Sequence, residues 1–106
     1  MALGALGGTR MPTAIVNTIC GIVDHGMCPL EAVDAPRFHA EGAWLEMESR
    51  LYWRLRNELE SRGWRLRPSA KGYDRAFALV FVAVRDTGGA FSGGSDPRGG
   101  GGFAIV

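Results

Sequence analysis

The sequence predicts an α+β fold with mostly antiparallel strands and one buried apolar helix. Residues 13–25 form a nearly uncharged apolar run, which predicts a helix that is covered on most sides. Residues 76–84 are a nearly continuous run of β-branched and aromatic side chains, typical of a central strand covered on both faces. Residues 86–89 then form a turn that would return the chain as a hairpin.

Composition places the chain among ordinary globular proteins. Of its 106 residues, 46% are hydrophobic and 22% are charged, so disorder is not expected, and residues 1–106 make one domain or a fragment of one. A net charge of +1 provides no field that would steer the chain toward nucleic acid or a membrane. No signal peptide is visible, and the apolar run at residues 14–23 is too short to span a bilayer. We therefore expect a soluble chain with neither partner, in a compartment that the sequence does not indicate.

The first helix is expected at residues 13–25. Pro12 is tolerated in a first helical turn, and Gly26 ends the helix. Its apolar stripe is wide, and comprises Ile15, Val16, Ile19, Cys20, Ile22 and Val23. The rest of the chain offers little to cover such a helix, so we expect a partner surface outside these residues. Without that surface, the isolated chain is expected to self-associate.

Four further elements follow from local patterns. Pro29 opens a short helix that ends near Asp34, before Pro36. Residues 43–48 alternate as a half-buried strand, with Leu45 and Met47 on the same face. Ser49 is the expected N-cap of a third helix, which ends at Gly63 and carries leucines at positions 51, 55 and 59. Residues 64–67 read as a short edge strand.

The last third of the chain is expected to be a hairpin and a tail. Residues 90–92 would pair with the strand at 76–84 across the turn. A flexible loop is expected at 99–102, followed by a short apolar tail at 103–106. The total is four or so strands and three helices, with no internal repeat or linker.

Gly7 and Gly8, at the threshold of the first helix, are the first candidate for chemistry. Adjacent glycines allow a turn that leaves backbone N–H groups exposed, and the following helix adds partial positive charge. Such a turn suits a bound carboxylate or the oxyanion that develops in acyl transfer. The alternative, which local sequence alone favours, is a loose loop.

The other polar motifs indicate structural roles. His25 is expected to cap a helix C-terminus, and His39 lies in a segment that reads as irregular. Asp96 and Arg98 flank Pro97, which predicts an ion pair or a side-chain cap that fixes the loop. Basic residues interleaved with Trp64 and Tyr73 read as a solvated face, namely Arg62, Arg65, Arg67, Lys71 and Arg75.

Acid–base and metal chemistry find little support in the remaining residues. Glu46 and Glu48 share a strand face without a visible acid–base partner. Cys20 reads as a small core residue, and neither it nor Cys28 has metal-ligand spacing, so no metal and no cofactor are expected.

Several segments together resemble the C-terminal part of the small subunit of γ-glutamyltransferases, in the N-terminal-nucleophile hydrolase superfamily. The longest match runs Glu31-Ala32-Val33-Asp34-Ala35-Pro36-Arg37-Phe38-His39. It follows Gly7-Gly8-Thr9-Arg10 and Asp24-His25-Gly26-Met27, and precedes Gly94-Ser95-Asp96-Pro97-Arg98-Gly99-Gly100. Their order and spacing also fit, so the resemblance covers nearly the whole chain.

The resemblance implies an αββα sandwich, of which this chain supplies a part, and transfer or hydrolysis of γ-glutamyl groups of glutathione and related amides. In such enzymes an N-terminal threonine attacks the amide, and a Gly-Gly pair that Gly7 and Gly8 match holds the oxyanion. The nucleophile and most substrate-gripping positions lie upstream of that pair. We therefore expect the upstream part of the enzyme as partner and no turnover by these residues alone.

Three departures from the family pattern leave the substrate open. Ala5-Leu6 replaces a common Ser-Pro, Cys28 stands where a better capping residue is usual, and residues 73–75 are more charged than is typical. A related acylase or amidase, or a non-catalytic binding or scaffold remnant of the fold, is the alternative.

Overall fold

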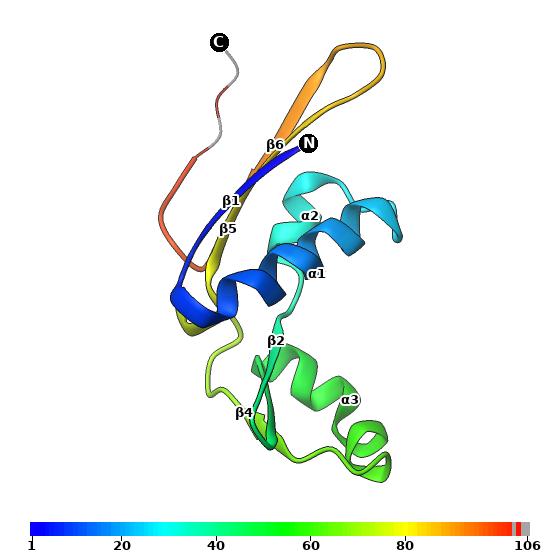
Figure 1. Ribbon diagram of the computed structural model, residues 1–106, viewed down its shortest axis with the longest axis vertical. Helices are drawn as coiled ribbons and strands as arrows, with labels where there is room; N and C mark the ends of the chain where they lie inside the picture. The colour runs from blue at the N-terminus through cyan, green and yellow to red at the C-terminus, as the bar shows by residue number, and fades with distance from the viewer. Residues whose placement is uncertain (103, 105–106) are drawn as a thin grey trace.

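The computed structural model describes residues 1–102 and 104 as two three-stranded sheets with helices beside them (Figure 1). The first sheet has the order β1-β5-β6, built from Ala2–Leu6, Leu79–Arg85 and Phe91–Ser95, and all its pairings are antiparallel. The second has the order β2-β3-β4, from Phe38–Glu41, Trp44–Met47 and Leu66–Pro68. Only the β3–β4 pairing is parallel among the described strands. The α+β class and the mostly antiparallel strands are confirmed.

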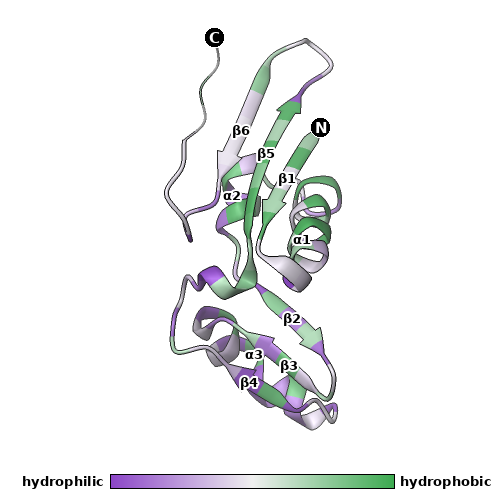
Figure 2. Cartoon of the chain, turned by 60° about the vertical axis from the view of Figure 1, so that its left-hand side comes forward, coloured by the Kyte–Doolittle hydropathy of each residue, from purple (hydrophilic) through white to green (hydrophobic). Residues whose placement is uncertain are grey.

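Three helices and two short 3₁₀ turns complete the chain. Helices α1 and α2, Met11–Val23 and Pro29–Asp34, lie along one face of the first sheet, whereas α3, Ser49–Ser61, lies beside the second sheet (Figures 1 and 2). The 3₁₀ turns η1 and η2, Gly8–Arg10 and Arg75–Phe77, precede α1 and β5. One face of the first sheet is thus covered by helices, which is half of a sandwich.

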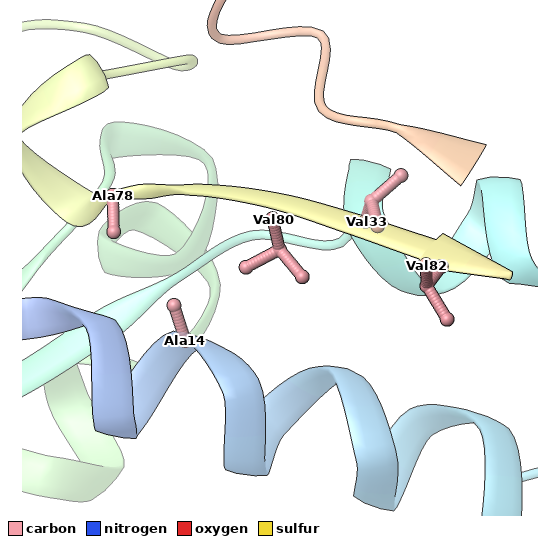
Figure 3. Close-up of a cluster of buried hydrophobic side chains, with 5 residues drawn as sticks. All are labelled: Ala14, Val33, Ala78, Val80 and Val82. Atoms are coloured by element: carbon pink, nitrogen blue, oxygen red, sulfur yellow. The ribbon is translucent and has the colours of Figure 1, made fainter. Parts of the chain in front are cut away.

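The core lies between β5 and the two helices that cover it. Val80 and Val82 of β5 point toward α1 and α2, and meet Ala14 and Val33 there (Figure 3). The opposite face of β5 carries Phe81, which is half-buried and lies against the segment at residues 99–102. We expected β5 to be covered on both faces. Helices cover one face fully, whereas the other face is covered only by the loop at residues 99–102.

Helix α1 corrects the prediction of a helix buried on most sides. It buries its small residues, Ala14, Thr18 and Gly21, because these allow close approach to β5 and α2. Some of its larger side chains face outward, with Val16 56% and Val23 65% exposed, whereas Met11 and Ile22 pack against the core. In Figure 2 the ribbon of α1 accordingly has the hydrophobic colour over much of its length. The apolar surface that was expected to need a partner is present and uncovered.

The structure confirms three predicted features: the second helix, the shared face of Leu45 and Met47 on β3, and the β5–β6 hairpin. Helix α3 begins one residue before its predicted start, with Glu48 at the cap position instead of Ser49. Strands β1 and β2 were not predicted. The predicted tail at 103–106 lies, apart from Ala104, outside the described residues.

Candidate active site around Gly7 and Gly8

The turn between β1 and η1 depends on its two glycines. Both have positive φ, at 134° for Gly7 and 68° for Gly8, a region that side chains disfavour. A Cβ on Gly7 would lie 2.7 Å from the Cα of Ala78, so no other residue fits there without a shift. A Cβ on Gly8 would have nothing within 4 Å, so that side of the turn is open. The chain therefore makes a tight turn whose second residue faces open space.

Backbone N–H groups are available at this turn. Among residues 1–102 and 104, no backbone hydrogen bond outside the helices and strands has the N–H of Gly7 or Gly8 as donor. The carbonyl of Gly8 accepts from the N–H of Met11, which closes the 3₁₀ turn into the start of α1. The positive end of that helix thus follows directly, and an anion at the turn would meet both effects.

An ion pair fixes the segment that follows the glycines. The Arg10 guanidinium donates to the Glu46 carboxylate of β3, and Arg67 of β4 contacts the same carboxylate at 3.4 Å. The hydrogen bond from Arg10 lowers the pKa of Glu46 below its ordinary value, so the carboxylate stays ionised at neutral pH. The turn is thereby tied to the second sheet.

A second polar link lies one helical turn further on. The Oγ1 of Thr13 lies 3.0 Å from Nδ1 of His39, and Nε2 of His39 lies 3.2 Å from a carboxylate oxygen of Glu41. His39 is therefore a buried residue of β2 that joins α1 to the second sheet, and not part of an irregular segment. His25 lies beyond the end of α1 and is exposed.

Four buried charged side chains lie behind the turn. They are Arg37, Glu48, Asp96 and Arg98, all at most 5% exposed. Arg98 donates to Glu48 through Nε at 2.6 Å, and to Asp96 through Nη1 at 3.0 Å. Arg37 forms an ion pair with the other oxygen of Asp96. Two guanidinium groups thus balance two carboxylates, as buried charges require.

This quartet (Arg37, Glu48, Asp96, Arg98) fixes the backbone against which Gly7 packs. Arg37 donates to the carbonyl of Ala78 at 2.7 Å, and Asp96 accepts from the N–H of Val80 at 2.9 Å. Ala78 itself has a φ of 69°, which is rare for a residue with a side chain. The Ala78 backbone that closes over Gly7 is therefore held by buried charge.

The predicted Asp96–Arg98 ion pair is confirmed, and Asp96 also accepts from the N–H of Arg98. Sequence patterns did not indicate that Arg37 and Glu48 belong to the same cluster. Arg37 lies in the longest segment that resembles the family, but neither that match nor the place of Glu48 after β3 indicated that the two side chains meet. Glu46 and Glu48, expected on one strand face, in fact make separate contacts, with Arg10 and with Arg98.

The basic residues and the cysteines singled out in the sequence do not join the site at Gly7 and Gly8. Arg65 and Arg67 lie over the ring of Trp44, at 4.3 and 4.7 Å, which fits the predicted solvated face. Both cysteines are free, and no group of three potential ligands could hold a metal ion among residues 1–102 and 104. In the same residues, no helix has the length and apolar character needed to cross a membrane.

Comparison with known proteins identifies relatives along the whole chain. Residues 1–106 match the family model described as gamma-glutamyltranspeptidase. The glutathione hydrolase proenzyme of Pseudomonas sp. (strain A14) is 30% identical over 99% of this chain, which spans 20% of that relative's length.

Solved structures show the same arrangement. The gamma-glutamyltranspeptidase from Pseudomonas nitroreducens complexed with L-DON matches with a TM-score of 0.81 and 27% identity, over 98% of this chain and 54% of that one. A cephalosporin acylase from Bacillus halodurans matches with a TM-score of 0.81 and 28% identity, over 91% of this chain and 18% of that one. The chain is therefore similar to a part of each of these larger proteins.

Proposed function

The chain belongs to the gamma-glutamyltranspeptidase family, and on this premise we propose that it is a C-terminal segment of an enzyme that transfers or hydrolyses γ-glutamyl groups. The substrates in view are glutathione and related amides. The chain spans a fifth of the length of its curated relative. Its proposed partner is therefore the remaining part of its own enzyme, which corresponds to the rest of that relative.

The observation that carries the proposal is the turn at Gly7 and Gly8. In the proposed reaction, a threonine hydroxyl supplied by the rest of the enzyme attacks the γ-glutamyl carbonyl carbon. The carbonyl oxygen becomes negatively charged, and the N–H groups of the two glycines donate to it. Collapse of this intermediate releases the amine and leaves an ester, which water or a second amine then cleaves.

Two features of the structure support this role. The open space at Gly8 lets a substrate oxygen approach the backbone, and the closed contact between Gly7 and Ala78 keeps the turn rigid. The quartet holds Ala78 from behind through Arg37. A fixed donor pair costs little reorganisation when the charge develops, which is what stabilisation of a transition state requires.

Cleavage of a γ-glutamyl anilide tests the proposal. The 106-residue chain alone is expected to give no turnover, and turnover is expected once the chain is combined with the upstream region of its enzyme. Turnover by the chain alone would contradict the account. No turnover by the correctly folded combination would favour a non-catalytic remnant of the fold.

A matched pair of glycine variants tests the oxyanion role within the combined enzyme. Gly8→Ala and Gly42→Ala introduce the same methyl group at similar φ values, 68° and 62°, and both positions are open. Gly42 lies in the turn between β2 and β3. The Gly8→Ala methyl group would occupy the open space through which the substrate oxygen approaches, so we expect kcat to fall by about 10²–10³-fold, as when one oxyanion donor is lost. Gly42→Ala should leave kcat unchanged, and equal losses would remove the evidence for a role of Gly8.

The similarity to a cephalosporin acylase supports a second candidate, an amidase for a different acyl group. The same turn would serve either reaction, because the oxyanion is common to both. Comparing kcat/KM of the combined enzyme for a γ-glutamyl anilide and a cephalosporin amide separates the two. We expect the γ-glutamyl substrate to be preferred.

A further inference from the structure

The outer edge of β2 presents backbone groups without a neighbouring strand. In the order β2-β3-β4, β2 lies at the margin of the second sheet, as Figure 2 shows. The carbonyl of Arg37 accepts from the N–H of Glu48 at 3.0 Å, so the antiparallel ladder joins this segment to β3 through residues 37, 39 and 41. The N–H and C=O groups of Phe38 and Ala40 therefore point away from β3. Within residues 1–102 and 104, no hydrogen bond outside the helices and strands involves them.

An apolar groove lies directly beside this edge, between β2 and α3. Its volume is 360 Å³. None of the residues of α3 is buried, so the helix covers the second sheet only in part. Side chains from both elements line the groove, among them Phe38, Ala40, Leu51, Leu55, Leu59 and Trp64. An apolar side chain on a strand placed next to β2 would enter this groove.

The opposite face of the second sheet brings negative charge to the same edge. Successive side chains of a strand alternate between the two faces, so His39 and Glu41 lie on the face opposite to Phe38 and Ala40. The Glu41 side chain is 58% exposed, and its one ion pair within the described part of the chain is with His39, at 3.2 Å. A basic side chain on an added strand would lie next to this carboxylate.

We propose that the outer edge of β2 docks an extended segment of another polypeptide, which adds as an antiparallel strand and alternates apolar with basic side chains. Main-chain hydrogen bonds to Phe38 and Ala40 hold the segment, its apolar side chains fill the groove, and a basic one pairs with Glu41. A second copy of β2 fits less well. Pairing through the same groups sets His39 against His39, and Glu41 against Arg37, which is 2% exposed and bound within the quartet. This inference does not depend on the proposed function, since docking requires no turnover.

Titration of the isotope-labelled 106-residue chain with a peptide, followed by NMR, tests the proposal. The probe is the heptapeptide Lys-Val-Lys-Val-Lys-Val-Lys, blocked at both ends. We expect saturable shifts of the Phe38 and Ala40 amides and of the Trp64 indole. The Trp53 indole, which lines a separate cavity beside Pro68, should stay unchanged. No saturable shift at β2 would overturn the proposal. Shifts of the β2 amides that depend on chain concentration without peptide would assign the edge to a second copy, and would overturn it as well.

Two control peptides test the alternation and the charge. One has the same composition with its valines grouped together, and the other has glutamate in place of every lysine. Each should bind at least about fivefold more weakly, because the first cannot place its valines in the groove at alternate positions and the second repels Glu41. Equal binding of either control peptide would contradict the proposed ligand chemistry.

N-methylation separates strand addition from simple hydrophobic adhesion. In an antiparallel pair with Phe38 and Ala40, the valine N–H groups face β2 and the lysine N–H groups face away. Methylating the valine nitrogens should weaken binding at least about tenfold, the loss of two or more hydrogen bonds, whereas methylating the lysine nitrogens should change it less than about twofold. Equal effects of the two modifications would exclude strand addition.

Two charge reversals in the chain make a matched pair. Glu41→Lys should invert the preference, so that the glutamate peptide binds more tightly than the lysine peptide. Glu60→Lys, at an exposed position of α3, should leave the preference as it is. Inversion by both variants or by neither would overturn the proposal.

Ala40→Pro tests the backbone edge itself. It removes an N–H that points away from β3, so no β2–β3 hydrogen bond is lost, and it should weaken binding of the lysine peptide at least about fivefold. Undiminished binding by this variant would contradict docking at the edge. If the variant does not fold, Glu41→Lys at its exposed position carries the test.

Discussion

Glu48→Gln is expected to destabilise the chain strongly. This buried carboxylate accepts hydrogen bonds from several side chains and backbone N–H groups, and no other side chain of the quartet could take over these bonds. Glu48 is fully buried and accepts from Arg98 at 2.6 and 2.7 Å. It also accepts from the backbone N–H groups of Arg37 and Asp74, at 3.0 and 2.8 Å, and from the Arg50 guanidinium at 3.1 Å. Glutamine keeps the shape but removes the charge, and it turns one acceptor into a donor that faces other donors.

The size of the effect follows from the burial of Arg98. Without the Glu48 charge, Arg37 and Arg98 share Asp96 as the one carboxylate left in the quartet, so one buried positive charge stays uncompensated, at a cost of about 3–5 kcal/mol. Small domains unfold with about 5–15 kcal/mol in total, so the variant retains a reduced fraction of the original stability. With urea slopes of about 1–3 kcal/mol per M, the unfolding midpoint should fall by at least about 1 M.

Urea unfolding followed by circular dichroism provides the assay, with Glu58→Gln as the matched control. Glu58 forms a surface pair with Arg62 at 3.0 Å, and both side chains are more than half exposed. Its loss should cost less than about 0.5 kcal/mol. If the two variants shift the midpoint by similar amounts, the quartet does not stabilise the fold as argued.

Three further predictions concern the surroundings of the turn and the exposed helix face. The pKa of Glu46 in the folded chain lies below its ordinary value of 4.5, so the Arg10 pair stabilises the fold above that pH and loses its effect as the pH falls through the lower folded value. Urea midpoints of Glu46→Gln and wild type should therefore differ at neutral pH and converge in strong acid. Val23→Glu places a charge on the uncovered face of α1 and should shift the chain toward monomer in sedimentation velocity, and an unchanged sedimentation coefficient would contradict a role of this face in self-association. Thr13→Val removes the bond to His39 and should lower the free energy of unfolding by about 1 kcal/mol, measured in the same urea assay.

Local patterns in the sequence were sufficient for elements whose signals lie within a few residues. The short helix at Pro29–Asp34 has a proline at its start and another just after its end, and the strand at Trp44–Met47 alternates clearly. Both were predicted because the cause of each lies inside the segment. The β5–β6 hairpin has the same property, since its turn residues connect the two strands directly.

Strands β1 and β2 could not be predicted in this way. Residues 2–6 consist of alanine, leucine and glycine, which have little preference for a strand, and they become one by pairing with β5 more than 70 residues later. Pairing with Trp44–Met47 likewise organises Phe38–Glu41, so His39 was misread as part of an irregular segment. In both strands tertiary pairing determines the structure, and composition does not.

For the candidate site too, the sequence predicts the local turn but not the long-range contacts that support it. Two adjacent glycines before a helix predict a turn, and the structure adds why each is needed: Gly7 for its contact with Ala78, and Gly8 for its open side. The support behind Ala78 comes from Arg37, 41 residues earlier in the chain, acting on a carbonyl. Because a bond to a backbone carbonyl leaves no trace in the sequence around residue 78, no local pattern could indicate it. A substitution at Arg37 should therefore disturb the turn at Gly7 although the two residues share no motif, and the shape of a candidate oxyanion hole would depend on a buried arginine that holds the backbone behind it.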